Sequence, residues 1–104
     1  MKHFIQTNLT LKYGSVPRFV EDMATIVPFL ASHGWTLAGA YSPIVGDLSH
    51  IIHLWELENL DCIPAAMTAI QSTPDIVAVV ERLADYVVEE RLQLVAKMPY
   101  SPEQ

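Results

Sequence analysis

The chain has 104 residues, of which 51% are hydrophobic and only 17% charged, a composition that fits one globular domain with a modest core and excludes a disordered chain. The net charge of −6, with six scattered Lys and Arg, argues against nucleic acid or an anionic membrane as a partner. The one cysteine, Cys62, cannot form an internal disulfide, and the sequence has no signal-peptide or membrane-span pattern. We therefore expect a cytoplasmic protein.

The N-terminal third of the chain predicts a strand followed by a helix. Residues 3–11 are rich in strand-forming side chains, and the turn that follows contains Gly14. Beyond the turn, apolar residues recur at helical spacing, which indicates an amphipathic helix. This apolar stripe consists of Val16, Val20, Met23, Val27 and Leu30, widened by Phe19 and Ile26. Pro28 lies within the helix and predicts a kink or an early end, and Gly34 closes the helix at its C-terminus.

Two strands joined by a turn follow this helix. Residues 35–45 predict the second strand, in which Gly39 indicates a bulge or a close approach of another group. Gly46 and Asp47 turn the chain into the third strand, residues 48–57, which is dominated by isoleucine, leucine and tryptophan. Both alternating sets of side chains in that strand contain large apolar groups. A strand of this kind must be covered on both faces.

The C-terminal half of the chain predicts two helices and a fourth strand. One helix begins after Asn59 or Asp61, and the next begins at residues 73–75 and continues at helical spacing to Val87. The sequence that follows fits a strand better than a longer helix, because apolar and polar residues alternate in it. Residues 98–104, which include two prolines, predict an extended C-terminal arm.

This order of elements predicts a single α+β domain over residues 1–104 with the ferredoxin-like βαββαβ fold and a four-stranded antiparallel sheet. The helices of such a fold bury only one face of the sheet, yet the central strands are apolar on both faces. Two protomers packed sheet to sheet would cover the open faces and leave a cavity between them. The pattern therefore predicts an obligate homodimer.

Five short motifs carry a resemblance to a known family. The most specific is the turn Gly46-Asp47 that leads into His53-Leu54-Trp55-Glu56. The others are Leu11-Lys12-Tyr13-Gly14, His33-Gly34-Trp35, Thr73-Pro74-Asp75 and Tyr100-Ser101-Pro102. Together, and in this order over nearly the whole chain, they resemble the NIPSNAP family. The resemblance implies a dimeric α+β barrel, in agreement with the fold argued above.

The resemblance does not select a reaction. The wider barrel superfamily includes cofactor-independent monooxygenases, haem-handling enzymes and small-molecule isomerases, and fold kinship of that breadth is compatible with many chemistries. Family members often carry an acidic and a basic residue in the first strand, where this chain has Ile5 and Thr7. A family activity that depends on those charges is therefore not implied for this chain.

His53 is the candidate catalytic residue. It shares one face of the third strand with Ile51 and Trp55, and if that face lines the cavity, His53 is a titratable group in an apolar pocket beside an aromatic wall. Its pKa would then suit an acid or a base. The alternative is that His53 is a buried histidine hydrogen-bonded across the sheet and that Trp55 is part of the core.

Polar residues of the neighbouring strands complete the predicted ligand pocket. Gln6 and Asn8 would offer hydrogen bonds from the first strand, and Tyr41 would add its hydroxyl from the second. No metal or other cofactor is expected, because His50 and His53 are three apart on a strand and point to opposite faces.

Two functions fit this sequence. In the first, a homodimer binds a small apolar molecule and acts on it without a cofactor, by proton transfer or oxygenation, with His53 as acid or base. In the second, side chains fill the barrel, and the dimer is a non-enzymatic binding or scaffolding module. The sequence alone does not decide whether the protein is an enzyme.

Overall fold

The structure is a computed structural model that describes residues 2–102. It contains seven elements in the predicted order. They are β1 (His3–Leu11), α1 (Val16–Ala31), β2 (Trp35–Tyr41), β3 (His50–Leu57), α2 (Cys62–Gln71), α3 (Pro74–Ala84) and β4 (Val87–Ala96).

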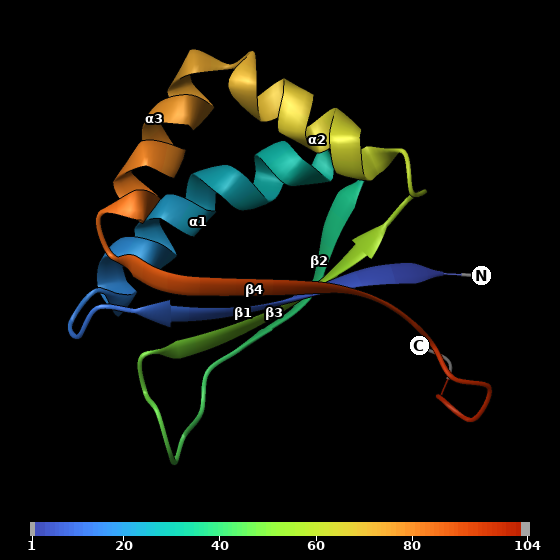
Figure 1. Cartoon of the computed structure of the whole chain (residues 1–104), viewed down its shortest axis with the longest axis horizontal. Coiled ribbons are helices and arrows are strands. Elements are labelled where there is room, and N and C mark those ends of the chain that lie inside the picture. The colour runs from blue at the N-terminus through green and yellow to red at the C-terminus, as the bar shows by residue number, and fades with distance from the viewer. Residues whose placement is uncertain (1, 103–104) are drawn as a thin grey trace.

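The four strands form one antiparallel sheet in the order β2-β3-β1-β4, and all three helices lie on one face of it (Figure 1). This arrangement is the ferredoxin-like α+β fold that the sequence predicts. The α2–α3 pair bends by 96° at its junction, so the two helices arch over α1 (Figure 1). Within residues 2–102, no helix lies on the opposite face of the sheet.

The register of the central strands decides which side chains face the helices. Thr7 lies opposite His53, and Ile5 lies opposite Trp55. Directly opposed residues of an antiparallel pair share a face, so these four side chains point to the same side of the sheet. All four are buried, whereas Gln6 and Asn8, on the other face of β1, are only half-buried. The buried set therefore faces the helices.

Helix α1 buries most of the predicted apolar stripe but departs from it at two positions. Val20, which the sequence places on the apolar stripe, is 63% exposed, and Asp22 is buried instead. The helix is turned so that Phe19, Ile26 and Leu30 face the sheet. Pro28 does not end the helix, which continues to Ala31.

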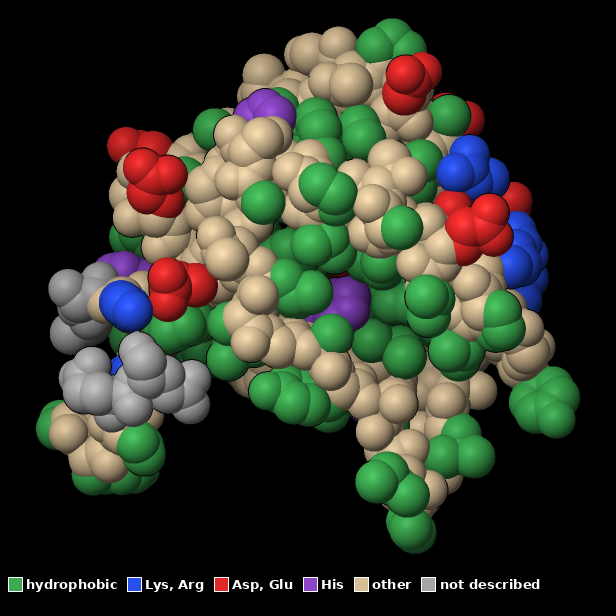
Figure 2. Space-filling model, turned by 180° about the vertical axis from the view of Figure 1, so that it is seen from behind, with side chains coloured by type: hydrophobic (Ala, Val, Ile, Leu, Met, Phe, Trp, Pro, Cys, Tyr) green, Lys and Arg blue, Asp and Glu red, His purple; other side chains and the backbone are tan. Residues whose placement is uncertain are grey.

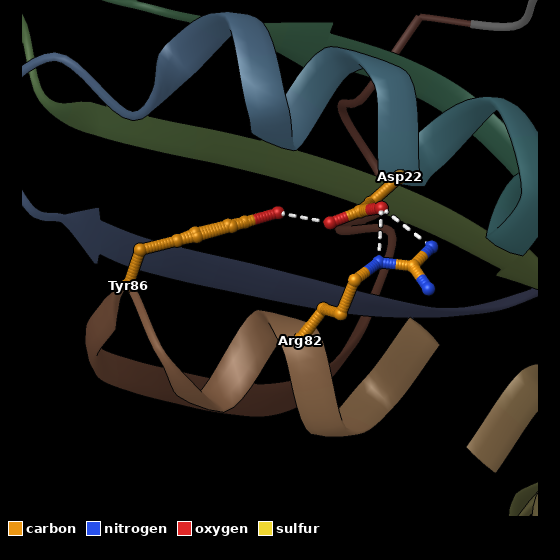
Figure 3. Close-up of polar contacts among 3 residues, drawn as sticks. All are labelled: Asp22, Arg82 and Tyr86. Atoms are coloured by element: carbon orange, nitrogen blue, oxygen red, sulfur yellow. Dashed lines mark hydrogen bonds and ion pairs between the residues drawn. The ribbon is translucent and has the colours of Figure 1, made fainter. Parts of the chain in front are cut away.

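A hydrogen-bond network explains why an aspartate is buried in α1. Asp22 accepts a 2.6 Å hydrogen bond from the hydroxyl of Tyr86 and bonds of 3.0 and 3.3 Å from Arg82 (Figure 3). Burial raises the pKa of the Asp22 carboxyl, but the bonds from Tyr86 and Arg82 and the charges of Arg82 and Arg18 together hold it below its ordinary value. The guanidinium of Arg18 also lies 4.6 Å from the centre of the Tyr86 ring. These contacts stabilise the packing of α1 against the junction of α3 and β4.

The second strand is shorter than predicted but contains the expected bulge. Strand β2 ends at Tyr41, and the chain forms a long loop before β3. The register between β2 and β3 shifts between Leu37 and Gly39. A β-carbon at Gly39 would lie 2.5 Å from the Tyr41 hydroxyl, so the absence of a side chain there lets the Tyr41 ring lie over the strand.

The last segment forms the predicted fourth strand, at an edge of the sheet. Most residues of β4 are exposed, including Leu92 and Leu94 at 54% and 49%. The arm expected over residues 98–104 is not extended, since Ser101 donates a backbone hydrogen bond of 2.9 Å to Met98 and closes a turn. Its last two residues lie outside the described part of the chain.

No helix of the described chain is long and apolar enough to cross a membrane by itself; α2 and α3 reach that length and composition only as a bent pair.

Candidate functional site

A cavity of about 520 Å³ lies between the helices and the sheet, within one protomer. All seven elements contribute to its walls, which are almost entirely apolar. Phe19, Met67 and Val80 line it from the three helices, and Trp35 and Leu92 line it from the outer strands. Figure 2 shows a recess walled by hydrophobic side chains with a histidine inside it, and the histidine that lines the cavity is His53.

Two aromatic side chains pack against the His53 ring, and a third packs against one of them. The ring stacks on Phe19 with a centroid distance of 5.7 Å, and Trp55 meets it edge-on at the same distance. Trp55 in turn packs edge-on against Trp35 at 6.1 Å. The indole N–H of Trp35 donates to the backbone carbonyl of Cys62 at 2.8 Å, so Trp35 has no free polar group for a ligand. The orientation of His53 is therefore fixed by packing.

Burial keeps His53 in its neutral form. The residue is 5% exposed, and this desolvation lowers the pKa of its imidazole below the ordinary value of 6.5. A neutral imidazole carries one donor and one acceptor nitrogen. Within residues 2–102, no hydrogen bond occupies either ring nitrogen of His53. The ring can therefore donate to a bound molecule or accept a proton from it.

Thr7 is a second polar group in the cavity wall, and it was not among the predicted site residues. It faces His53 across the β1–β3 ladder, where opposed side chains lie about 5 Å apart at their β-carbons. Its hydroxyl oxygen is buried and has no hydrogen-bond partner among the described residues. A buried hydroxyl without a partner is costly, so native proteins rarely keep one. The feature of the sequence that could have identified Thr7 is its place in the strand, since it is the polar residue between Ile5 and Leu9 on the buried face.

The charged groups of the lining lie on β4. They are Glu89 and Glu90, and neither lysine nor arginine lines the cavity in the described part of the chain. Glu89 forms an ion pair with Arg91 at 2.5 Å. Glu90 is exposed as a whole residue, yet desolvation raises the pKa of its carboxyl.

The structure separates the predicted pocket residues into two groups. His53 and Trp55 line the cavity, and Ile51 is buried beside it in the core cluster of Leu9. Gln6 and Asn8 do not line it, because they point to the open face of the sheet, as even-numbered residues of β1 must.

The polar residues outside the cavity either form hydrogen bonds with other side chains or are exposed to solvent. Gln6 accepts a 2.8 Å hydrogen bond from Gln93, and Asn8 is bonded to His50 at 3.2 Å. Tyr41 is 60% exposed and covers Gly39. His50 thus lies on the open face and His53 on the helix face, as strand alternation requires.

This cavity is distinct from the one that the sequence predicts, which would form only between two protomers. The sequence places the ligand cavity between two sheets, whereas the cavity described here lies on the helix side of a single sheet. The reason is the bend between α2 and α3, which carries these helices away from the sheet and leaves a space that Met67 and Val80 border but do not fill. Within residues 2–102, no three histidine, cysteine or acidic side chains gather in a group that could hold a metal ion.

Comparison with known proteins identifies the family. The NIPSNAP family model matches residues 7–102. The chain belongs to the NIPSNAP family. A comparison with curated protein sequences finds no match.

Solved structures agree with this assignment. A NIPSNAP family protein with unknown function from Agrobacterium tumefaciens has a TM-score of 0.83 at 18% identity, over 97% of this chain and 92% of that one. An uncharacterized NIPSNAP-like domain protein from Burkholderia xenovorans has a TM-score of 0.79 at 17% identity, over 98% and 90% of the two chains. A cofactor-independent oxygenase from Streptomyces nogalater has a TM-score of 0.76 at 14% identity, over 98% of each chain. At these identities the likeness establishes the shared fold.

Proposed function

We propose that this NIPSNAP protein binds a small, largely apolar molecule in the cavity, and that Thr7 and His53 hold one polar group of that molecule. The observation that carries the proposal is the buried Thr7 hydroxyl, which has no partner among the described residues and lies opposite a neutral His53. A ligand oxygen between the two side chains would supply the missing hydrogen bond. The apolar walls supply the rest of the binding energy through buried hydrocarbon surface.

The same pair of residues suits proton transfer without a cofactor. His53 is neutral because it is buried, so it can take a proton from a ligand carbon or oxygen. The ligand is left with an anionic oxygen, which the Thr7 hydroxyl stabilises by donating a hydrogen bond. The proton returns from His53 to another atom of the ligand in an isomerisation. Alternatively, when the proton is taken from carbon, the resulting enolate reacts with dioxygen; a cofactor-independent oxygenase shares this fold. Conversion of a CH2 group and O2 to a carbonyl and water balances without a further reductant.

A homodimer is the second part of the proposal. Ile52 and Leu54 of β3 lie half-buried on the face of the sheet that no described helix covers. A second copy packed on this open face would bury both side chains. The cavity lies on the other face, so each protomer keeps its own site.

Binding is tested by calorimetry with naphthol, an apolar aromatic alcohol, as the probe. Replacement of Thr7 by valine keeps the shape of the side chain and removes its hydroxyl. We expect it to weaken binding about fivefold, which corresponds to the net free energy of one hydrogen bond. Thr10→Val is the matched control, since Thr10 lies on the open face. Equal affinities of the wild type and Thr7→Val would contradict the site.

Proton transfer is tested separately by following deuterium exchange at the acidic carbon of β-tetralone in D2O. We expect the wild type to accelerate the exchange and His53→Gln to abolish the acceleration. His50→Gln is the control, because His50 lies on the opposite face. Binding of the ketone without any acceleration would favour the non-enzymatic binding module over the enzyme.

A further inference from the structure

We propose that Glu90 makes the cavity selective for ligands with a cationic amine at their outer end and unfavourable for carboxylates. The inference rests on the proposed function, since it concerns the same cavity, and it adds the charge class of the ligand.

Position is the first argument. Glu90 lies opposite Leu9, which in turn lies opposite Ile51, so the Glu90 side chain is on the helix side of the sheet. Leu92, two residues further along β4, lies opposite Thr7 on the same side. The Glu90 carboxyl therefore belongs to the set of opposed residues that lies next, on the same face of the sheet, to the set that contains Thr7 and His53. Because β4 is the edge strand and Glu90 is exposed, the carboxyl lies at the mouth of the cavity and not at its base.

Charge is the second argument. The ion pairs of the described chain join Lys2 with Glu56, Arg82 with Asp22, and Arg91 with Glu89, so none of them compensates Glu90. Neither lysine nor arginine of residues 2–102 lines the cavity. A carboxylate ligand would therefore enter an apolar space past an unpaired negative charge and meet no cation inside.

Solvation is the third argument. Val88 and Leu92 lie two residues on either side of Glu90, and both line the cavity. These apolar neighbours withdraw water from the carboxyl, in agreement with the raised pKa of Glu90. An ammonium group at the mouth would replace the lost solvation with an ion pair, while the ligand's hydrocarbon remains in the cavity.

The test uses three probes with one hydrocarbon skeleton: naphthylmethylamine, naphthylmethanol and naphthoic acid. Their dissociation constants are measured by calorimetry at neutral pH for the wild type, Glu90→Gln and Glu81→Gln. Glu81 is exposed on α3 and does not line the cavity, so Glu81→Gln makes the same change in net charge away from the site.

We expect the wild type to bind the amine most tightly and the acid most weakly. Glu90→Gln should reduce the ratio of amine to acid affinity about fivefold, the size of an exposed ion pair, and leave the alcohol unchanged. Glu81→Gln should leave the ratio at its wild-type value. Binding of the alcohol with an amine-to-acid ratio that Glu90→Gln does not alter would overturn the role of Glu90 alone. Failure of all three probes to bind would overturn the proposed ligand site and the selectivity together.

Discussion

His53 and Thr7 show how one face of the sheet determines the chemistry of the site. Both side chains are buried, both are polar, and each lies opposite the other across the β1–β3 ladder. Neither has another described residue as a hydrogen-bond partner. The unpaired, buried Thr7 hydroxyl costs folding free energy, and a ligand that accepts its hydrogen bond would recover that cost.

The pH dependence of stability follows from the lowered pKa of His53. At pH values between that lowered pKa and 6.5, the unfolded chain binds a proton at His53 and the folded chain does not. Unfolding therefore takes up a proton, and the free energy of unfolding falls as the pH decreases through this window. We expect His53→Gln to flatten this dependence in urea titrations.

The raised pKa of Glu90 acts in the opposite direction, at pH values between the ordinary carboxyl value of 4.5 and the raised value. His53→Gln leaves Glu90 in place, so the difference between the pH profiles of the wild type and this variant belongs to His53. An unchanged pH dependence in His53→Gln would contradict the neutral buried state of this histidine. His50→Gln serves as the control for removal of a histidine elsewhere on β3.

Thr7→Val should separate stability from binding. In the unliganded protein the substitution removes a buried hydroxyl without a partner, so we expect the free energy of unfolding to rise by about 1 kcal/mol. The same substitution weakens ligand binding, as argued above. Loss of stability in chemical denaturation would indicate that the hydroxyl has a structural partner and would remove the basis of the ligand site.

Gly34 offers a prediction with an internal control. Gly34 and Gly14 both have a positive φ, +87° and +82°, so alanine is strained at either position. At Gly34 a β-carbon would also collide with the sulfur of Cys62, whereas at Gly14 nothing lies within 4 Å. Gly14→Ala should cost about 1 kcal/mol. Gly34→Ala should cost about 1 to 3 kcal/mol more in thermal unfolding, and equal costs would contradict the packing of Cys62 against this turn.

Strand alternation predicts part of the site from the sequence. It places His53 and Trp55 on one face and His50 on the other, as the structure does. It does not reveal which face of the sheet meets the cavity, so the sequence favours Gln6 and Asn8 as ligand contacts although both lie on the open face. It does not single out Thr7, because a hydroxyl is informative only when its lack of a partner is visible in the structure.

At the scale of secondary structure, α1 shows how a tertiary contact overrides hydrophobic spacing. Val20 fits the stripe by spacing but is exposed, and Asp22 replaces it at the interface with α3. The sequence contains no local signal for this exchange of Val20 for Asp22, because the partners of Asp22 are 60 and 64 residues away along the chain. The strands were predicted better, since each is defined by its own alternation and turns.

The Asp22 network should contribute to both stability and acid resistance. Asp22→Asn removes the negative charge that Arg82 and Tyr86 bond, and we expect a loss of about 2 to 3 kcal/mol in the free energy of unfolding at neutral pH. The pKa of Asp22 is lowered in the folded state, so its stabilisation is present above the ordinary value of 3.8 and is lost as the pH falls through the lowered value. The loss caused by Asp22→Asn should therefore shrink in strong acid.

Glu21→Gln is the matched control for Asp22→Asn, since Glu21 is the exposed neighbour of Asp22 on α1. A double-mutant cycle of Asp22→Asn with Tyr86→Phe measures the coupling directly. Additive losses in that cycle would show that the 2.6 Å bond carries no coupling energy and would contradict the network.

At the scale of the whole molecule, the helices cover one face of the sheet and leave the other free. The order of elements is sufficient to predict this arrangement, because a βαββαβ chain with short connections places its helices on the same side. The cavity could not be predicted in the same way. It depends on the 96° bend between α2 and α3, and the sequence specifies the break at Pro74 but not the angle.

The proposed homodimer is testable by native mass spectrometry of the purified protein. We expect a dimer, and we expect Leu54→Lys to convert it to a monomer by placing a charge on the open face of the central strand. Val20→Lys is the control, since Val20 is 63% exposed on the helix side. A wild-type monomer, or a dimer that Leu54→Lys does not affect, would contradict an interface on the open face.

The contact between Trp35 and Trp55 has an optical consequence. They are the two tryptophans of the sequence, and both line the cavity. Their rings are 6.1 Å apart and inclined by 70°, a separation at which the transition dipoles of two indoles couple. The tryptophan fluorescence of the protein therefore originates at the cavity wall, and its far-ultraviolet circular dichroism should contain an exciton couplet from this pair. Entry of a molecule into the cavity will change both signals without any added label.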